Sequence, residues 1–187
     1  MKTIYDYFRC ALLASVAVLA ICMCMFASCS GDDNDVPGGG SAQIGVHRID
    51  LYFDNGFQNW YNLIIVHGVK PDGSFNKLYE NGKELSFVSE GTQIQGYASE
   101  ELRDYSISTD DNCGAMVATV SMSSLNGLPA TRDVTITAVG YINGKRIYTK
   151  VFTLPAGAAS MAMVFTTDDG GESELIIDGV IVESDHD

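Results

Sequence analysis

Residues 134–154 read VTITAVGYINGKRIYTKVFTL, two runs rich in β-branched and aromatic residues joined by Asn143-Gly144. Asn-Gly favours a two-residue hairpin turn, because both of its positions readily take a positive φ. The spacing therefore predicts two antiparallel strands that meet at this turn. The expected cross-strand pairs are Ile142 with Lys145, Ile136 with Val151, and Val134 with Thr153.

This register divides the side chains of the hairpin between two faces, because successive residues of a strand point to opposite sides. The face expected to cover a core carries Val134, Ile136, Ala138, Ile147 and Val151. The other, more polar face carries Thr135, Thr137, Val139, Tyr141, Arg146, Tyr148, Lys150 and Phe152. A hairpin with one apolar and one mixed face is typical of a sheet that is solvated on one side.

The same pattern extends from residue 44 to residue 182, where Asn-Gly or Asp-Gly dipeptides separate apolar runs of strand length. The strands predicted from it are Val46–Phe53, Tyr61–Val69, Glu84–Ser89, Thr92–Tyr97, Ala115–Met122, Val134–Ile142, Lys145–Leu154, Ser160–Phe165 and Leu175–Val182. The last run forms either a small hairpin or one long apolar strand. Only Ala98 to Tyr105 has a helical pattern.

About nine short strands predict an all-β fold of two packed antiparallel sheets. In strand number and turn chemistry, residues 44–182 resemble immunoglobulin-like or fibronectin-like β-sandwiches. A true antibody-type domain is excluded, since the Cys-Trp-Cys spacing is missing.

The N-terminus has the layout of an export signal. Lys2 and Arg9 precede an uncharged apolar run from Cys10 to Phe26, which is short beside the ~20 residues of a transmembrane helix. The following Phe26-Ala27-Ser28-Cys29 resembles a bacterial lipobox, with Phe in place of the usual Leu. That resemblance implies cleavage after a signal peptide of residues 1–28, and membrane anchoring by lipid on Cys29. The alternative is an uncleaved N-terminal anchor.

An acidic and glycine-rich segment follows Cys29. The stretch from Ser30 to Asp35 resembles the acidic signal of Bacteroidota-type lipoproteins, which implies export to the outer membrane and exposure at the cell surface. The glycines after Pro37 favour a flexible spacer. We therefore expect a tether over residues 29–43, one β-sandwich domain over residues 44–182, and an acidic tail over residues 183–187.

The charge balance restricts the class of partner. The whole chain has 11 Lys and Arg against 24 Asp and Glu; without residues 1–28, which hold two basic residues and one acidic, the balance is 9 against 23. Nucleic acid and anionic lipid both require a basic surface, so the charge argues against both. It favours a soluble domain with a neutral or cationic partner.

The sequence contains no catalytic signature, and we expect neither enzymatic activity nor a cofactor. His67 lies within an apolar run and is interpreted as a core or strand-end residue, and Cys113 is interpreted as a packed thiol. The acidic segments 110–112 and 168–174 do not match the spacing of a calcium loop, so they are interpreted as solvated turns and no metal is expected.

Aromatic residues concentrate near Asp54-Asn55-Gly56. Sugar sites combine exposed aromatic planes with carboxamides and carboxylates, which makes this loop the candidate ligand-binding site. Its residues are Asp54, Phe57, Asn59, Trp60 and Tyr61. The alternative is that Trp60 and Phe57 pack in the core.

These observations predict a lipid-anchored binding module of the cell envelope that captures polysaccharide or another ligand at the outer surface. The alternative is a structural or assembly subunit of a surface complex such as a fimbria, in which the apolar strand near residues 175–182 complements an envelope protein.

Overall fold

The computed structural model describes residues 43–57, 60–86, 93–98, 104–125, 127–167 and 173–184. Cys29 and the expected signal peptide lie outside these residues. Within the described ranges, no helix is long and apolar enough to cross a membrane. The described elements are β1 (His47–Phe53), the 3₁₀ turn η1 (Asn55–Phe57), β2 (Trp60–Val69), β3 (Leu78–Glu80), β4 (Lys83–Glu84), β5 (Gln93–Ala98), β6 (Tyr105–Thr109), β7 (Ala115–Ser124), β8 (Val134–Ile142), β9 (Lys145–Leu154), β10 (Ser160–Thr166), β11 (Ser173–Ile177) and β12 (Val180–Ser184).

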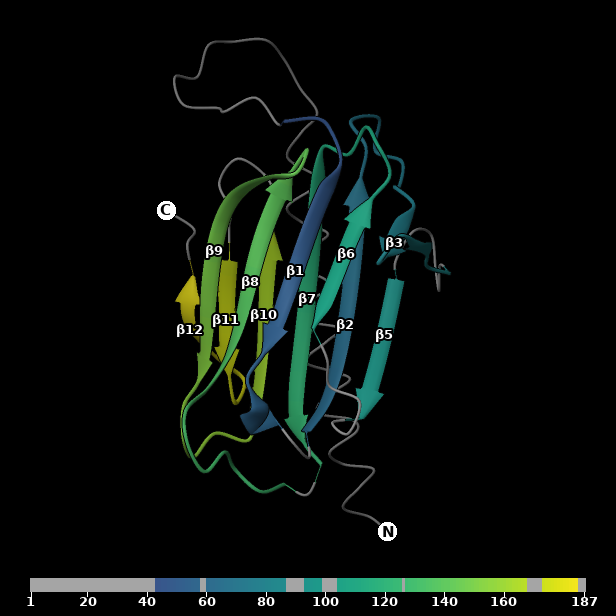
Figure 1. Ribbon diagram of the computed structural model, residues 1–187. Coiled ribbons are helices and arrows are strands. Elements are labelled where there is room, and N and C mark those ends of the chain that lie inside the picture. Colours follow the sequence, from purple (N-terminus) through teal and green to yellow (C-terminus); the bar gives the residue numbers. More distant parts are fainter. Residues whose placement is uncertain are drawn as a thin grey trace, which may run out of the picture. The chain divides into compact units, whose positions relative to one another are not determined.

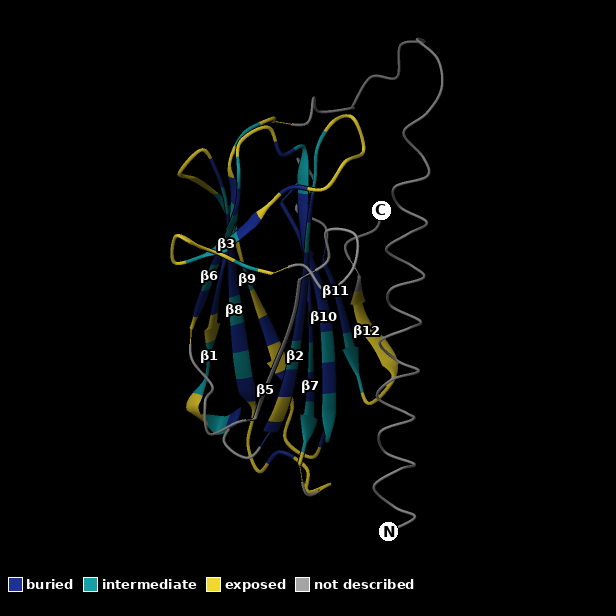
Figure 2. Cartoon of the chain, turned by 90° about the vertical axis from the view of Figure 1, so that its right-hand side faces the viewer, coloured by how far each residue is buried: buried dark blue, intermediate teal, exposed yellow. Residues whose placement is uncertain are grey.

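These strands form two antiparallel sheets that pack face to face (Figure 1). The β1 sheet has the order β4-β3-β6-β1-β8-β9, and the β7 sheet has the order β12-β11-β10-β7-β2-β5. The expectation of an all-β, two-sheet sandwich is thus confirmed. Buried residues lie between the sheets, while the turns at both ends are exposed (Figure 2).

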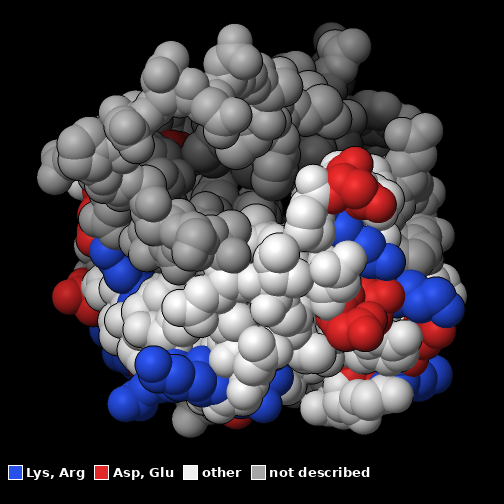
Figure 3. Space-filling view, turned by 90° about the horizontal axis from the view of Figure 1, so that it is seen from above, with Lys and Arg blue, Asp and Glu red and all other residues white. Residues whose placement is uncertain are grey.

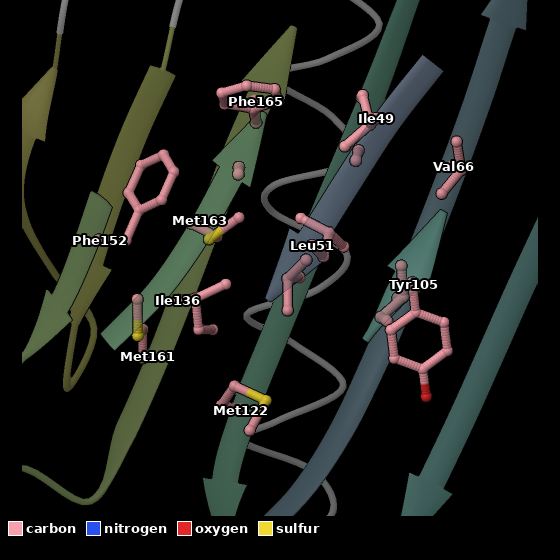
Figure 4. Packing of buried hydrophobic residues seen from close by; sticks show 14 of the residues in the cluster. Ile49, Leu51, Val66, Tyr105, Met122, Ile136, Phe152, Met161, Met163 and Phe165 are labelled. Atoms are coloured by element: carbon pink, nitrogen blue, oxygen red, sulfur yellow. The ribbon is translucent and has the colours of Figure 1, made fainter. Parts of the chain in front are cut away.

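The core is filled from the inner faces of both sheets (Figure 4). Ile49, Leu51 and Ile136 come from the β1 sheet, and Met122 and Met163 come from the β7 sheet. Ile49, Leu51, Ile136 and Met122 alternate with polar or exposed neighbours, which is the period-two pattern of a sheet with one buried face. At roughly 1.5–3 kcal/mol for each fully buried large apolar side chain, this layer is the main stabilising contribution in a domain whose described part has no disulfide.

The predicted hairpin forms, but the register predicted for it is wrong beyond the turn. Ile142 pairs with Lys145 as expected, whereas Ile136 lies opposite Phe152 and Val134 lies opposite Leu154. The cause is a bulge: Gly140 pairs with Tyr148 and Tyr141 pairs with Arg146, so that Ile147 is an extra residue on β9. One inserted residue moves every following side chain to the other face.

The expected faces of β9 are therefore exchanged. Phe152 and Leu154 are fully buried, and Tyr148 packs against Phe165 with ring centroids 4.8 Å apart. Val151 and Ile147, assigned to the core, lie on the outer face, and Val151 is 54% exposed. The faces of β8 are as expected.

Two other expectations are revised, and one open alternative is decided. Ala98 ends β5 and Tyr105 begins β6, so both ends of the expected helix are strand residues; residues 99–103 lie outside the described part. Of the strand expected at residues 84–89, Glu84 belongs to β4 (Lys83–Glu84), residues 85 and 86 are not in a strand, and residues 87–89 lie outside the described part. β3 and β6 were not predicted. Of the two alternatives for the C-terminal run, the hairpin is correct, with Asp178 and Gly179 at φ 47° and 82° in its turn.

Candidate functional site

The loop predicted to contact a ligand does not form one surface. Trp60 is 5% exposed and Phe57 is fully buried, and their rings pack edge to face with centroids 5.8 Å apart. The packing alternative is therefore correct for both residues, because each completes the core at this end of the sandwich. Tyr61 is exposed on the outer face of the β7 sheet, and Asn59 lies outside the described residues.

Asp54 is engaged within the protein. Its carboxylate pairs with the Arg132 guanidinium and accepts a hydrogen bond of 2.7 Å from the Gly56 backbone N–H. The Arg132 hydrogen bond, followed by the one from Gly56, lowers the pKa of Asp54. These contacts hold η1 against the loop before β8, so we assign Asp54 a structural role.

The outer face of the β1 sheet instead brings polar and aromatic side chains together. A row across four strands runs from Tyr79 through Ser108 and Arg48 to Tyr141, since each is directly opposite the next. Asp50 and Tyr52 follow Arg48 at alternate positions of β1, on the same face. We call Arg48, Asp50, Tyr52, Tyr79 and Tyr141 the tyrosine face.

Arg48 and Asp50 are fixed at its centre. The Arg48 guanidinium carbon lies 3.9 Å from the Tyr141 ring centroid, and Arg48 Nε lies 3.2 Å from Asp50 Oδ1. The Ser106 hydroxyl donates a 2.7 Å hydrogen bond to the same Asp50 oxygen. Charges held in this way on a rigid sheet are pre-organised for a ligand, because little side-chain entropy is lost on binding.

Tyr52 is the accessible ring of the tyrosine face. It is 43% exposed and directly opposite Thr137 on β8. Burial raises the pKa of its hydroxyl, and so do the nearby Asp50, Tyr141 and Asp104, while Arg48 lowers it. The hydroxyl therefore stays protonated at neutral pH and can donate a hydrogen bond.

This arrangement is suited to binding. An exposed ring beside a guanidinium offers an apolar plane together with hydrogen-bond donors, and the buried Asp50 carboxylate holds that guanidinium in place. The sequence contained the signal, because Arg48, Asp50 and Tyr52 alternate with buried residues within β1. The partner strands that supply Tyr79 and Ser108 were not predicted, so the row could not be assembled from the sequence.

The histidine and cysteine side chains fit structural roles. His47 is fully buried, with Nδ1 2.6 Å from Thr167 Oγ1 and Nε2 2.8 Å from the Gln43 carbonyl oxygen. Burial lowers the pKa of His67 and raises the pKa of the Cys113 thiol to about 11. Cys113 is thus the packed thiol that was expected.

Acidic residues at the end of the sandwich that holds the Asn143-Gly144 turn are engaged in local contacts. Asp110 accepts a 2.6 Å hydrogen bond from Asn76 Nδ2, and Asp72 accepts a 2.7 Å hydrogen bond from the Ser74 hydroxyl. Figure 3 shows basic and acidic side chains close together near the rim of this end, with uncharged residues between them. Within the described part of the chain, no three His, Cys, Asp or Glu side chains are grouped as metal ligands.

Solved structures with a similar fold include two from Bacteroides. One is a domain of unknown function, DUF4425, from Bacteroides vulgatus, with a TM-score of 0.54 and 20% sequence identity over 67% of this chain and 95% of that chain. The other is a DUF4425 family protein from Bacteroides ovatus, with a TM-score of 0.53 and 17% identity over 67% of this chain and 96% of that chain. The similarity shows a shared fold. No family model and no curated protein match the sequence.

Proposed function

We propose that this protein is a lipid-anchored binding module of the bacterial cell envelope that captures polysaccharide on the tyrosine face. The observation that carries the proposal is the exposed Tyr52 ring beside the fixed Arg48–Asp50 pair. Sugars have apolar C–H faces and polar rims, so an aromatic plane with the guanidinium of Arg48 and the hydroxyl of Tyr52 as hydrogen-bond donors meets both parts. A sheet face also accommodates an extended chain.

The anchor rests on sequence. The lipobox-like Phe26–Cys29 stretch and the acidic segment behind it support lipid on Cys29 and exposure at the outer surface. The origin of the two similar folds in Bacteroides agrees with the resemblance of that segment to Bacteroidota-type lipoproteins. The tether then keeps the domain near the membrane while the tyrosine face stays free to meet a ligand. A Cys29→Ala variant tests the anchor, since it should lose incorporation of labelled fatty acid and leave the membrane fraction.

The binding proposal is tested with the full chain in detergent, by gel mobility in the presence of starch, xylan, mannan, pectin or mucin glycans. We expect one class of polysaccharide to retard the protein. Tyr52→Ala should weaken this retardation at least tenfold, because each stacked aromatic ring contributes substantially to a sugar site. Tyr61→Ala is the matched control, since Tyr61 is a similarly exposed tyrosine on the other sheet. Equal losses in both variants, or retardation by no glycan, would contradict the proposal.

A further inference from the structure

Both sheets end in an open strand on the same side of the sandwich. β9 is the last strand of the β1 sheet, and β12 is the last strand of the β7 sheet (Figure 1). The two edges are joined by an ion pair of 3.4 Å between Lys150 Nζ and Glu183 Oε1. We call these two strands the β9/β12 side.

This side carries exposed apolar residues. Val151 on β9 is 54% exposed, and Val180, Ile181 and Val182 on β12 are 63%, 55% and 55% exposed. These three exposed residues of β12 are successive, and Val182 is a bulged residue, because Leu175 pairs with Glu183 and Ile176 pairs with Ile181. The charges of this side, Lys150 and Glu183, pair with each other, and a run of exposed apolar residues on an edge strand is a template for pairing with another strand. At the opposite end of the β1 sheet, by contrast, β4 consists of the exposed charges Lys83 and Glu84.

The charges of the β9/β12 side are complementary to each other. β9 begins with the exposed Lys145 and Arg146 and also carries Lys150, whereas β12 carries Glu183. An interface between identical surfaces must be self-complementary, so that what one half presents the other half accepts. A basic edge beside an acidic one, with valines next to both, meets this condition.

We infer that the β9/β12 side binds a second copy of this chain, with a twofold axis parallel to the strands. Rotation about such an axis places β12 of one copy against β9 of the other, and it leaves the position of each residue along the axis unchanged. β9 and β12 run in opposite directions (Figure 1), so the pairing between copies is antiparallel. The Lys150–Glu183 ion pair places these two residues at the same position along the axis in one copy. Because β9 and β12 run in opposite directions, Val151 and Val182 also share one position, and Val182 lies opposite Val151 of the second copy. Each sheet then continues into a sheet of the other copy, and the exposed valines are covered.

This geometry is tested by disulfide crosslinking of the full chain in the membranes of cells that produce two variants together. Val151→Cys on one chain and Val182→Cys on the other should give a species of twice the monomer mass after mild oxidation, at least tenfold above wild type. Each variant alone should stay at monomer mass, because the twofold axis keeps like positions on opposite faces of the interface. Within one chain the two positions lie on different sheets, about 10 Å apart, which is too far for a disulfide.

Tyr61→Cys together with Val151→Cys is the control, since Tyr61 is exposed on β2, away from the β9/β12 side. A second measurement is the molar mass in detergent, where Ile181→Lys should convert dimer to monomer without changing the β-sheet signal in circular dichroism. The inference is wrong if Val151→Cys links to neither Val182→Cys nor Ile181→Cys, or if Val182→Cys links efficiently to itself. It is also wrong if the linked species contains a different protein, which would identify a foreign strand as the occupant. These outcomes do not depend on whether the tyrosine face binds polysaccharide.

Discussion

Ile136 lies directly opposite Phe152. This pair fixes the register of the longest hairpin, places Phe152 between the two sheets, and leaves its neighbour Val151 on the surface. Phe152 in turn contacts Phe165 of the opposite sheet edge to face, with centroids 6.3 Å apart. The register that the bulge after Gly140 sets thus determines which residues of β9 pack between the sheets and which are exposed.

Phe152→Ala should lower the free energy of unfolding by about 3–5 kcal/mol, because it removes a fully buried ring from between the sheets. Val151→Ala should change the value for the monomer by less than about 0.5 kcal/mol, because Val151 is exposed in the single chain. Urea denaturation of the two variants beside the wild type measures both values. A larger loss of unfolding free energy for Val151→Ala than for Phe152→Ala would support the register expected from turn spacing alone.

Asn62→Leu should stabilise the domain. The Asn62 side chain is fully buried on β2, opposite Met122, and neither Nδ2 nor Oδ1 has a hydrogen-bond partner in the described structure. A buried polar group without a partner destabilises the folded state by about 1–3 kcal/mol, and an apolar side chain of similar volume removes this penalty. The midpoint of denaturation should rise, with an unchanged dependence on urea. A clear fall in the midpoint would show that the amide makes a favourable contact in the folded protein.

The Asp54–Arg132 pair should make the stability of the domain depend on pH in the acidic range. The pKa of Asp54 is lowered in the folded state, so its contribution is fully present above the unfolded pKa of about 3.9 and is lost as the pH falls through the folded pKa. Asp54→Asn should therefore be less stable than wild type at neutral pH, and the two proteins should converge in acid below pH 4. Thermal denaturation from pH 2 to pH 7 measures this difference. A gap that stays constant over that range would exclude the ionised carboxylate as its cause.

Cys113 should be unreactive in the folded protein. Burial raises the pKa of its thiol to about 11, so almost no thiolate, the reactive form, exists at pH 8. Iodoacetamide at pH 8 should leave the peptide that contains Cys113 unmodified, as measured by mass spectrometry. The same treatment in denaturant should modify it fully. Rapid modification without denaturant would contradict the buried position.

The sequence predicted the sandwich where the local signal was strong. β8 and β9 have the predicted bounds, because β-branched residues on both sides of Asn143-Gly144 leave little choice of structure. The bulge after Gly140 escaped prediction, since an inserted residue depends on how two strands fit, not on the composition of either. β6 was not predicted because its polar Ser106 and Ser108 follow a segment of helix-forming residues, and its pairing with β1 and β3 makes it a strand.

The candidate site, too, could be predicted only where it depends on local sequence. An aromatic cluster in the sequence indicated a ligand surface, but the cluster does not show which rings point inward. Alternation along β2 sends Trp60 into the core and Tyr61 outward. The tyrosine face required the order β3-β6-β1-β8, which unites residues from 48 to 141. Contacts between strands this far apart in sequence depend on the topology of the whole domain.

Comparison of polysaccharide affinity between wild type and Tyr52→Ala, with Tyr61→Ala as control, tests the central claim most directly. Trp60, the only tryptophan, reports on folding in the same samples, and its buried ring should give a blue-shifted emission that glycan leaves unchanged. We predict that one polysaccharide class binds wild type and Tyr61→Ala equally well and Tyr52→Ala at least tenfold more weakly. Undiminished binding by a folded Tyr52→Ala protein would contradict the tyrosine face as the site.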